Sequence, residues 1–218
     1  MNFKRGKDEY TNKVNYAGNH AKSLHISVEA SLKKLRTSYI DILYVHWWDY
    51  TTSVEEIMNA LHNLVFQGKV LYLVCCITVL SANDTHTGYK GISGTPAWIV
   101  SKANQYAKDH GKTPFSVYQG KWSVLERSFE REIIPMARAE GLALAPWAVL
   151  GAGKIRSDAE EQHRRETGEK GRTMFGPDWE RTEEERKVCL VLEEVAKEVG
   201  VENITSGALA PYRSRQFC

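Results

Sequence analysis

The chain has 218 residues, of which 42% are hydrophobic and 26% charged, a balance typical of a soluble globular protein with one sizeable domain. Its 29 basic and 27 acidic residues are mixed along the sequence and leave a formal net charge of +2, which disfavours nucleic acid or an anionic membrane as the main partner. We find no signal peptide and no apolar stretch approaching the ~20 residues of a membrane span, so we expect a cytoplasmic protein without a membrane segment.

The first half of the chain alternates predicted helices and strands. An amphipathic helix is predicted from Ser23 to near Thr37, and residues 40–46 form a nearly continuous apolar run typical of a buried parallel strand. A second helix is bounded by the capping-box pair Ser53 and Glu56 and by a glycine at position 68. Residues 70–73 then form the next predicted strand.

The same alternation continues in the second half. A helix is predicted from Thr95, as its N-cap, to Gly111, and strands are predicted at 115–119 and 142–145 around a helix at 129–140. Residues 158–172 are polar and predict an exposed loop or a weak helix. Residues 182–199 predict an amphipathic helix that ends at a glycine. This cadence indicates an α/β fold with parallel strands, in either a doubly wound sheet or a barrel.

Candidate functional residues lie at the ends of the predicted strands, because ligands of both kinds of α/β fold bind at the carboxyl ends of parallel strands. These residues are His46, Trp47 and Asp49 after the first strand, Gln119 after the third and 147–153 after the fourth. The cysteines Cys75, Cys76, Cys189 and Cys218 have no zinc-ligand spacing and share none with the histidines, so no metal site is predicted.

Four stretches, at 15–20, 40–49, 113–122 and 145–153, resemble the aldo-keto reductases, in the branch of the aryl-alcohol dehydrogenases and norsolorinic acid reductases. The second stretch, IDILYVHWWD, is similar to the fourth barrel strand of that family, the third to the sixth strand and the last to the seventh. The resemblance implies one incomplete domain over residues 1–218, folded as a partial (β/α)8 barrel that lacks the first three strands and the last.

The resemblance also implies roles for individual residues. His46 would be the catalytic histidine, and Trp47 and Trp48 would contact substrate. The implied cofactor is NADP, held at Ser93, Gln119, Trp147, Leu150, Gly151 and Gly153. A neutral imidazole can donate a hydrogen bond to a carbonyl oxygen as charge develops there, and glycines let backbone N–H groups approach phosphate. Taken alone, a strand-end histidine is more often structural, and a G-x-G pair is a weak phosphate signal.

Three departures from the family bear on activity. The tetrad aspartate, tyrosine and lysine of the family have no matching position here, and the tyrosine is its proton donor. The segment that binds the NADP 2′-phosphate is also unmatched, which makes NADP binding by these residues doubtful. Residues 74–90 interrupt the family pattern between Leu73 and Gly91. We interpret this insert as a retained intron, with a surface loop as the alternative.

The expected function is that of an NADP-dependent oxidoreductase acting on an aromatic, polyketide or terpenoid aldehyde, ketone or alcohol, in fungal secondary-metabolite biosynthesis. Because the tyrosine proton donor is unmatched, we expect the chain as written to be inactive, and the alternative function is that of a remnant that binds only a partner or a paralogue. Exposed barrel edges would in either case offer a surface for self-association. A metal or nucleic-acid binder is disfavoured.

Overall fold

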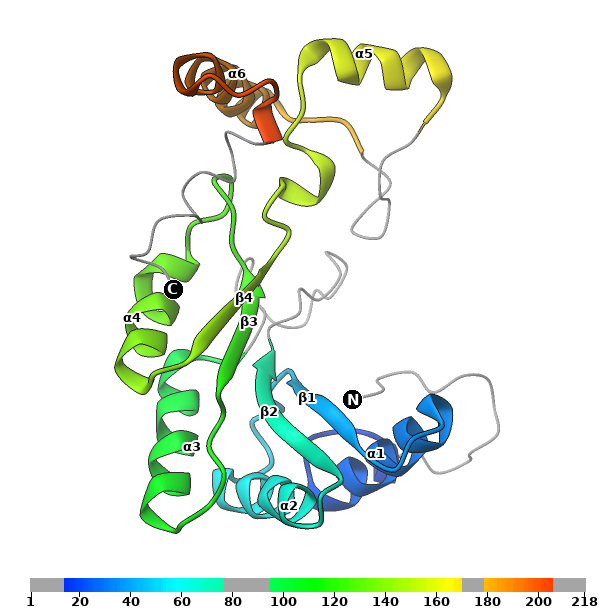
Figure 1. Ribbon diagram of the computed structural model, residues 1–218, viewed down its shortest axis with the longest axis vertical. Coiled ribbons are helices and arrows are strands. Elements are labelled where there is room, and N and C mark those ends of the chain that lie inside the picture. Colours follow the sequence, from blue (N-terminus) through cyan, green and yellow to red (C-terminus); the bar gives the residue numbers. More distant parts are fainter. Residues whose placement is uncertain (1–13, 77–94, 170–178, 206–218) are drawn as a thin grey trace. The chain divides into compact units, whose positions relative to one another are not determined.

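In the computed structural model, which describes residues 14–76, 95–169 and 179–205, the four strands form one sheet (Figure 1). The strands are β1 (Ile40–His46), β2 (Val70–Cys76), β3 (Val117–Lys121) and β4 (Ala143–Trp147), and they lie side by side in chain order. Parallel strands alternating with helices confirm the predicted α/β class.

The register of the sheet aligns the carboxyl ends of β1 and β2, whereas β3, predicted at 115–119, continues to Lys121. In the parallel pair of β1 and β2, Ile40 lies opposite Val70 and His46 opposite Cys76. In the next parallel pair, Cys76 lies opposite Gln119. Strand β2 is therefore three residues longer than the strand predicted at 70–73, because pairing with both neighbours carries it on to Cys76.

Five helical segments accompany these strands: η1 (Val14–Tyr16), α1 (Ala21–Leu35), α2 (Val54–Phe66), α3 (Ala97–Asp109) and α4 (Phe129–Glu140). Helix α1 begins two residues before the predicted start, because the imidazole Nδ1 of His20 accepts a hydrogen bond from the Ser23 N–H and caps the helix. Helix α3 has Pro96 as its N-cap, one residue later than predicted. Both shifts are within the usual uncertainty of helix ends.

Two further helices follow the sheet: α5 (Asp158–Thr167) and α6 (Glu183–Val199). Helix α6 has the predicted bounds, with a full capping box between Thr182 and Glu185. Helix α5 is a regular helix with Ser157 as its N-cap. Of the two alternatives predicted for 158–172, the exposed loop was therefore wrong, and the helix was right over residues 158–167. A 3-10 turn, η2 (Gly151–Gly153), precedes them.

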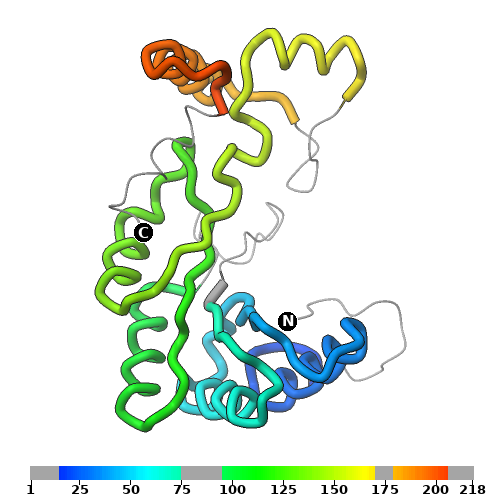
Figure 2. Tube along the Cα trace, in the orientation of Figure 1, coloured from blue at the N-terminus to red at the C-terminus, as the bar shows by residue number. Residues whose placement is uncertain are grey.

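The chain divides into two compact units. The first contains β1, β2 and helices α1 to α3, which Figure 2 traces from blue to green, and its core includes Val45, Ile57, Leu61, Leu73 and Val100. In the second, which contains η2, α5 and α6, the buried residues Ile155, Cys189 and Ile204 form a cluster. Each unit therefore has apolar residues of its own to stabilise it.

In the first unit, four large apolar side chains of the sheet are exposed, among them Leu71 of β2 at 47%. Ile42 and Tyr44 of β1 are 48% and 41% exposed, and Tyr72, which pairs with Ile42, is 60% exposed. None of the helices in the described ranges is long and apolar enough to cross a membrane. The same ranges contain no cluster of three His, Cys, Asp or Glu residues that could hold a metal ion.

Candidate active site

His46 is the last residue of β1, at the carboxyl end of a parallel strand. Its side chain is half-buried, and the loss of hydration there lowers the pKa of the imidazole below its ordinary value of 6.5. The imidazole is consequently neutral at pH 7, with one ring nitrogen carrying a proton and the other free to accept one. This state can donate a hydrogen bond to a carbonyl oxygen.

Gln119 lies at the same level of the sheet as His46. Both are paired with Cys76, from opposite sides of β2, so two strand spacings, about 10 Å, separate their backbones. Gln119 is also half-buried. The structure therefore brings these two predicted residues to one edge of the sheet. Ser93 and most of the insert, residues 77–90, lie outside the described residues.

The two tryptophans after His46 differ in exposure. Trp47 is half-buried and has a φ of +67°, in the left-handed region that non-glycine residues seldom adopt. Trp48 is only 4% exposed and contributes to the core. In this conformation Trp47 is therefore the tryptophan of the pair that a substrate can reach more easily.

A dense hydrogen-bond network holds the loop that carries Trp47. The Asn19 Nδ2 donates to the Trp47 carbonyl oxygen at 2.9 Å, and the Asn19 N–H donates to Asp49 Oδ2 at 2.6 Å. In return the Asp49 N–H donates to Asn19 Oδ1 at 2.9 Å. Burial opposes ionisation of Asp49, but hydrogen bonds from Asn19, Thr52 and Thr51 hold the pKa of its carboxyl below the ordinary 3.8.

In the second unit, the predicted phosphate-binding segment is a tight turn. The N–H groups of Gly151 and Gly153 donate to the carbonyl oxygens of Ala148 and Leu150, at 2.8 and 3.1 Å. Leu150 packs against the cluster of Ile155, Cys189 and Ile204. The two N–H groups that were expected to meet phosphate are thus used inside the turn in this conformation. Trp147, also half-buried, precedes it.

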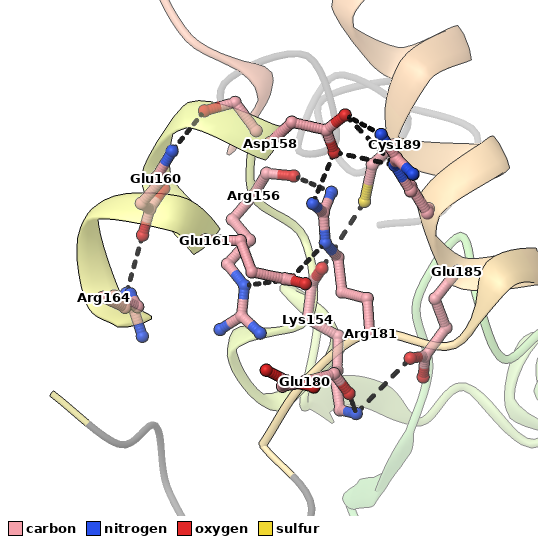
Figure 3. Close-up of polar contacts among 12 residues, drawn as sticks. Lys154, Arg156, Asp158, Glu160, Glu161, Arg164, Glu180, Arg181, Glu185 and Cys189 are labelled. Atoms are coloured by element: carbon pink, nitrogen blue, oxygen red, sulfur yellow. Dashed lines mark hydrogen bonds and ion pairs between the residues drawn. The ribbon is translucent and has the colours of Figure 1, made fainter. Parts of the chain in front are cut away.

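A buried arginine, Arg156, supports the end of this turn, and Figure 3 shows its ion pair with Glu161. Arg156 is 1% exposed, and its guanidinium donates to the Gly153 carbonyl oxygen at 3.2 Å, to the Trp179 carbonyl oxygen at 2.6 Å and to Glu161 at 2.9 Å. Arg181 donates to the same Glu161 carboxylate at 2.6 Å. This network joins the turn to α5 and to the chain that leads into α6.

Sequence reasoning missed most of the residues in these two networks. Asp49 was noted at a strand end, but its partner Asn19 was seen only as part of a sequence resemblance. Asn19 and Asp49 are 30 residues apart. The N-cap of α1 is His20, which is not one of the usual N-cap residues, so no local signal drew attention to the neighbouring Asn19. No local pattern marks Arg156 as buried.

Comparison with known proteins relates the chain to fungal reductases. It is 56% identical over 218 residues to an aryl-alcohol dehydrogenase [NADP(+)] of Phanerodontia chrysosporium, covering 99% of this chain and 52% of that protein. It is 49% identical over 197 residues to an aldo-keto reductase of Aspergillus calidoustus, and 48% identical over 197 residues to norsolorinic acid reductase B of Dothistroma septosporum. These matches cover 90% of this chain in both cases, and 45% and 44% of the respective relatives.

The chain thus spans about half the length of the curated relatives it matches. The model of the Aldo/keto reductase family matches residues 6–81 and 86–210, which is most of the sequence, and the chain belongs to that family.

Proposed function

We propose that the chain carries part of the active site of an NADP-dependent aldo-keto reductase, with His46 as its catalytic residue. One observation carries the proposal: a neutral imidazole lies at the carboxyl end of β1 and is aligned with Gln119 through the register of the sheet. Family membership supports the same assignment. We further propose a partial (β/α)8 barrel as the architecture, because the family implies a barrel and the four strands lie side by side in chain order.

The proposed substrate is an aromatic, polyketide or terpenoid aldehyde, ketone or alcohol, in secondary metabolism. This class is taken from the relatives, which include an aryl-alcohol dehydrogenase and a norsolorinic acid reductase. In the proposed reaction the His46 ring N–H donates a hydrogen bond to the substrate carbonyl oxygen and stabilises the negative charge that develops there. Since the tyrosine proton donor is unmatched, water would supply the proton that converts this oxygen to a hydroxyl. The half-buried ring of Trp47 would contact the aromatic part of the substrate.

The fit of the residues to NADP is uneven. Gln119, the middle residue of β3, lies opposite the end of β2 and is suited to hydrogen-bond the nicotinamide carboxamide, and Trp147, with its half-buried indole, is suited to stack on the ring. The turn at Gly151 and Gly153 fits less well, since both N–H groups have acceptors within the turn. When bound, NADPH would supply the hydride. We accordingly assign Gln119 and Trp147 to the cofactor first, and Leu150, Gly151, Gly153 and Ser93 only by resemblance.

The competing proposal is a catalytically inactive chain that binds a second copy or a longer paralogue. The exposed apolar side chains of Ile42, Tyr44 and Tyr72 favour it, because apolar groups on a sheet face are usually covered.

The experiment that separates the two proposals uses the purified chain of 218 residues, mixed with NADPH and veratraldehyde. The reductase proposal predicts that the absorbance of NADPH falls with time and that the His46→Gln variant abolishes this loss. His62→Gln is the matched control, because His62 lies in α2 and contacts Thr113 instead of the strand end. NADPH that is neither bound nor oxidised by the parent chain would reject the reductase proposal and leave the inactive one.

Residues 74–90 form the last part of the proposal: we interpret them as a retained intron. The family model matches residues 6–81 and 86–210, so within 74–90 only residues 82–85 are unmatched. The surface-loop alternative is favoured by Val74, which continues β2 opposite Tyr44 and Val117. Sequencing of cloned transcripts decides: transcripts that uniformly contain these codons would reject the intron.

A further inference from the structure

Polar contacts attach the start of α1 to the loop after His46 and to α2, and a close approach at Gly18 adds a steric constraint. Asn19, which is 1% exposed, makes reciprocal hydrogen bonds with Asp49. The Ala21 N–H donates to Glu56 Oε1 at 2.9 Å, so the capping-box glutamate of α2 is used to hold α1. A Cβ atom on Gly18 would lie 2.7 Å from Asp49 Oδ2, which leaves room only for glycine. The contact is therefore close and specific.

The loop held by this contact has a backbone conformation that is unfavourable for its non-glycine residues. Trp47 and Tyr50 have φ values of +67° and +58°, in the left-handed region where the Cβ of a non-glycine residue approaches the backbone too closely. Such conformations persist only where surrounding interactions impose them. Here the Asn19 amide binds the Trp47 carbonyl oxygen, while Asp49 accepts hydrogen bonds from the N–H groups of Thr51 and Thr52 at 3.0 and 2.9 Å.

The constrained residue Trp47 directly follows His46. The direction of the Trp47 peptide fixes where β1 stops, and the side chain of the last strand residue is oriented by the backbone on both of its sides. On one side, the sheet holds His46 opposite Cys76. On the other side, the hydrogen bond from Asn19 holds the Trp47 carbonyl group. A change in that hydrogen bond is thus transmitted to His46 through a single residue.

We propose that Asn19 is a positioning residue, which orients the His46 imidazole at the strand end by holding Trp47 in its left-handed conformation against Asp49. The inference rests on the proposed function of His46, and it adds to that site a residue that lies just before α1. Asn19 does not itself touch the reacting atoms. Catalytic groups must be held close to their productive geometry, and displacements of about 1 Å can cost 100-fold in rate.

The test compares Asn19→Ala with Asn59→Ala in the full chain. Asn59 is a matched control, because its amide also makes a long-range hydrogen bond, to the Tyr106 hydroxyl at 3.2 Å, but it does so away from the strand end. The pKa of His46 is measured by NMR titration of the imidazole, and its resonance is assigned by its loss in His46→Gln. We expect Asn19→Ala to move the pKa of His46 upward, toward 6.5, as the ring becomes more hydrated, and Asn59→Ala to leave it in place.

A purely structural role for Asn19 predicts a different result. Both variants would then lower the midpoint of thermal unfolding, and the His46 titration of each folded variant would match that of the parent, which would overturn the proposal. Asn19→Ser is the second variant, in case Asn19→Ala does not fold. If neither folds, Asn19 is a determinant of folding and the positioning role is rejected.

The titration needs neither cofactor nor turnover, so it can be read even if the proposed reductase function fails. Where the parent oxidises NADPH, we expect Asn19→Ala to lower kcat about tenfold or more while leaving the KM for NADPH unchanged. Equal losses in Asn19→Ala and Asn59→Ala would contradict the proposal.

Discussion

His46 and Gln119 lie opposite the same residue, Cys76, from the two sides of β2. This alignment places two side chains that are 73 positions apart in the sequence at one edge of the sheet, with about 10 Å between their backbones. Because of this distance we propose that the two side chains contact different molecules, His46 the substrate and Gln119 the cofactor.

The first prediction concerns Gln119. If the amide of Gln119 holds only the nicotinamide carboxamide, Gln119→Ala weakens the binding of the cofactor by the same amount in the ground state and in the transition state. We expect the KM for NADPH to rise about tenfold, the value of one hydrogen bond of ~1.4 kcal/mol, with little change in kcat. Gln105→Ala is the control, because Gln105 is an exposed residue of α3 that donates to Asp109. A fall in kcat with an unchanged KM would assign Gln119 to the chemical step instead.

The second prediction is the pH dependence of stability that His46 causes. Burial lowers the pKa of His46 in the folded state, so the unfolded chain binds more protons once the pH falls below 6.5. The folded state therefore loses stability as the pH falls from 6.5 toward the lowered pKa. We expect the urea midpoint of the parent to drop more steeply over this range than that of His46→Gln. Parallel curves for the two proteins would show that His46 is as hydrated in the folded chain as in the unfolded one.

The bounds of some elements could be predicted from sequence because the determining contacts are local. Helices α2 and α6 begin where Ser53 and Thr182 each accept a hydrogen bond from a backbone N–H three residues on. The apolar run of β2, VLYLVCC, does continue to Cys76, and the prediction ended at Leu73 only because residues 74–90 were interpreted as an insert. Pairing with β1 and β3 shows that the first three of those residues belong to the strand.

The same distinction applies to the candidate site. His46 and Gln119 were predicted, because strand-end residues of parallel sheets meet at one edge. The Asn19 and Asp49 contact joins residues 30 positions apart, and Arg181 reaches Glu161 across 20 positions. For this reason the sequence does not distinguish a loop from a weak helix at α5. The acidic first turn of that helix is held by arginines from a distant segment. Polar contacts at such separations have no periodic signature in the sequence.

The third prediction tests the buried arginine network of the second unit. Arg156→Met leaves the Glu161 carboxylate, 9% exposed, without one of its two buried arginine partners, and leaves the Gly153 and Trp179 carbonyl oxygens without this donor. We expect a loss of about 3 kcal/mol in the free energy of unfolding, measured in urea. Arg164→Met removes a more exposed pair with Glu160 in the same helix and should cost about 0.5 kcal/mol. Equal costs would indicate that Arg156 is hydrated in solution.

The fourth prediction concerns acid. Hydrogen bonds from Arg186 and Arg181 lower the pKa of Asp158 from 3.8 to about 2. The lowered pKa means that the stabilisation is complete above 3.8 and is lost as the pH falls from 3.8 through about 2. We expect the urea midpoint of the parent to exceed that of Asp158→Asn near neutral pH, and the difference to disappear as the pH approaches the lowered pKa. A difference that persists there would show that the two proteins differ in packing and not in charge.

The last prediction concerns Gly151, where glycine could be required either by the left-handed backbone conformation or by the close approach of a neighbouring side chain. Gly151 has a φ of +60°, and a Cβ atom there would lie 2.7 Å from Leu125 Cδ1. Gly168 has a φ of +71°, and among the described residues no atom lies within 4 Å of the place that a Cβ atom would take there. Gly168→Ala should therefore cost only the left-handed conformation, about 1 kcal/mol. Gly151→Ala should cost about 2 kcal/mol more, because of overpacking.

Leu125→Ala removes the atom that a Cβ on Gly151 would strike, so the two substitutions should be coupled. We expect Gly151→Ala in the Leu125→Ala background to cost no more than Gly168→Ala does in the parent, as measured by urea unfolding. In that case packing accounts for the glycine at 151 without any phosphate, in agreement with an N–H group that already donates to Ala148. Additive costs in the double variant would instead show that the contact with Leu125 does not destabilise Gly151→Ala. Loss of NADPH binding in the single variant Gly151→Ala would then support a cofactor role for Gly151.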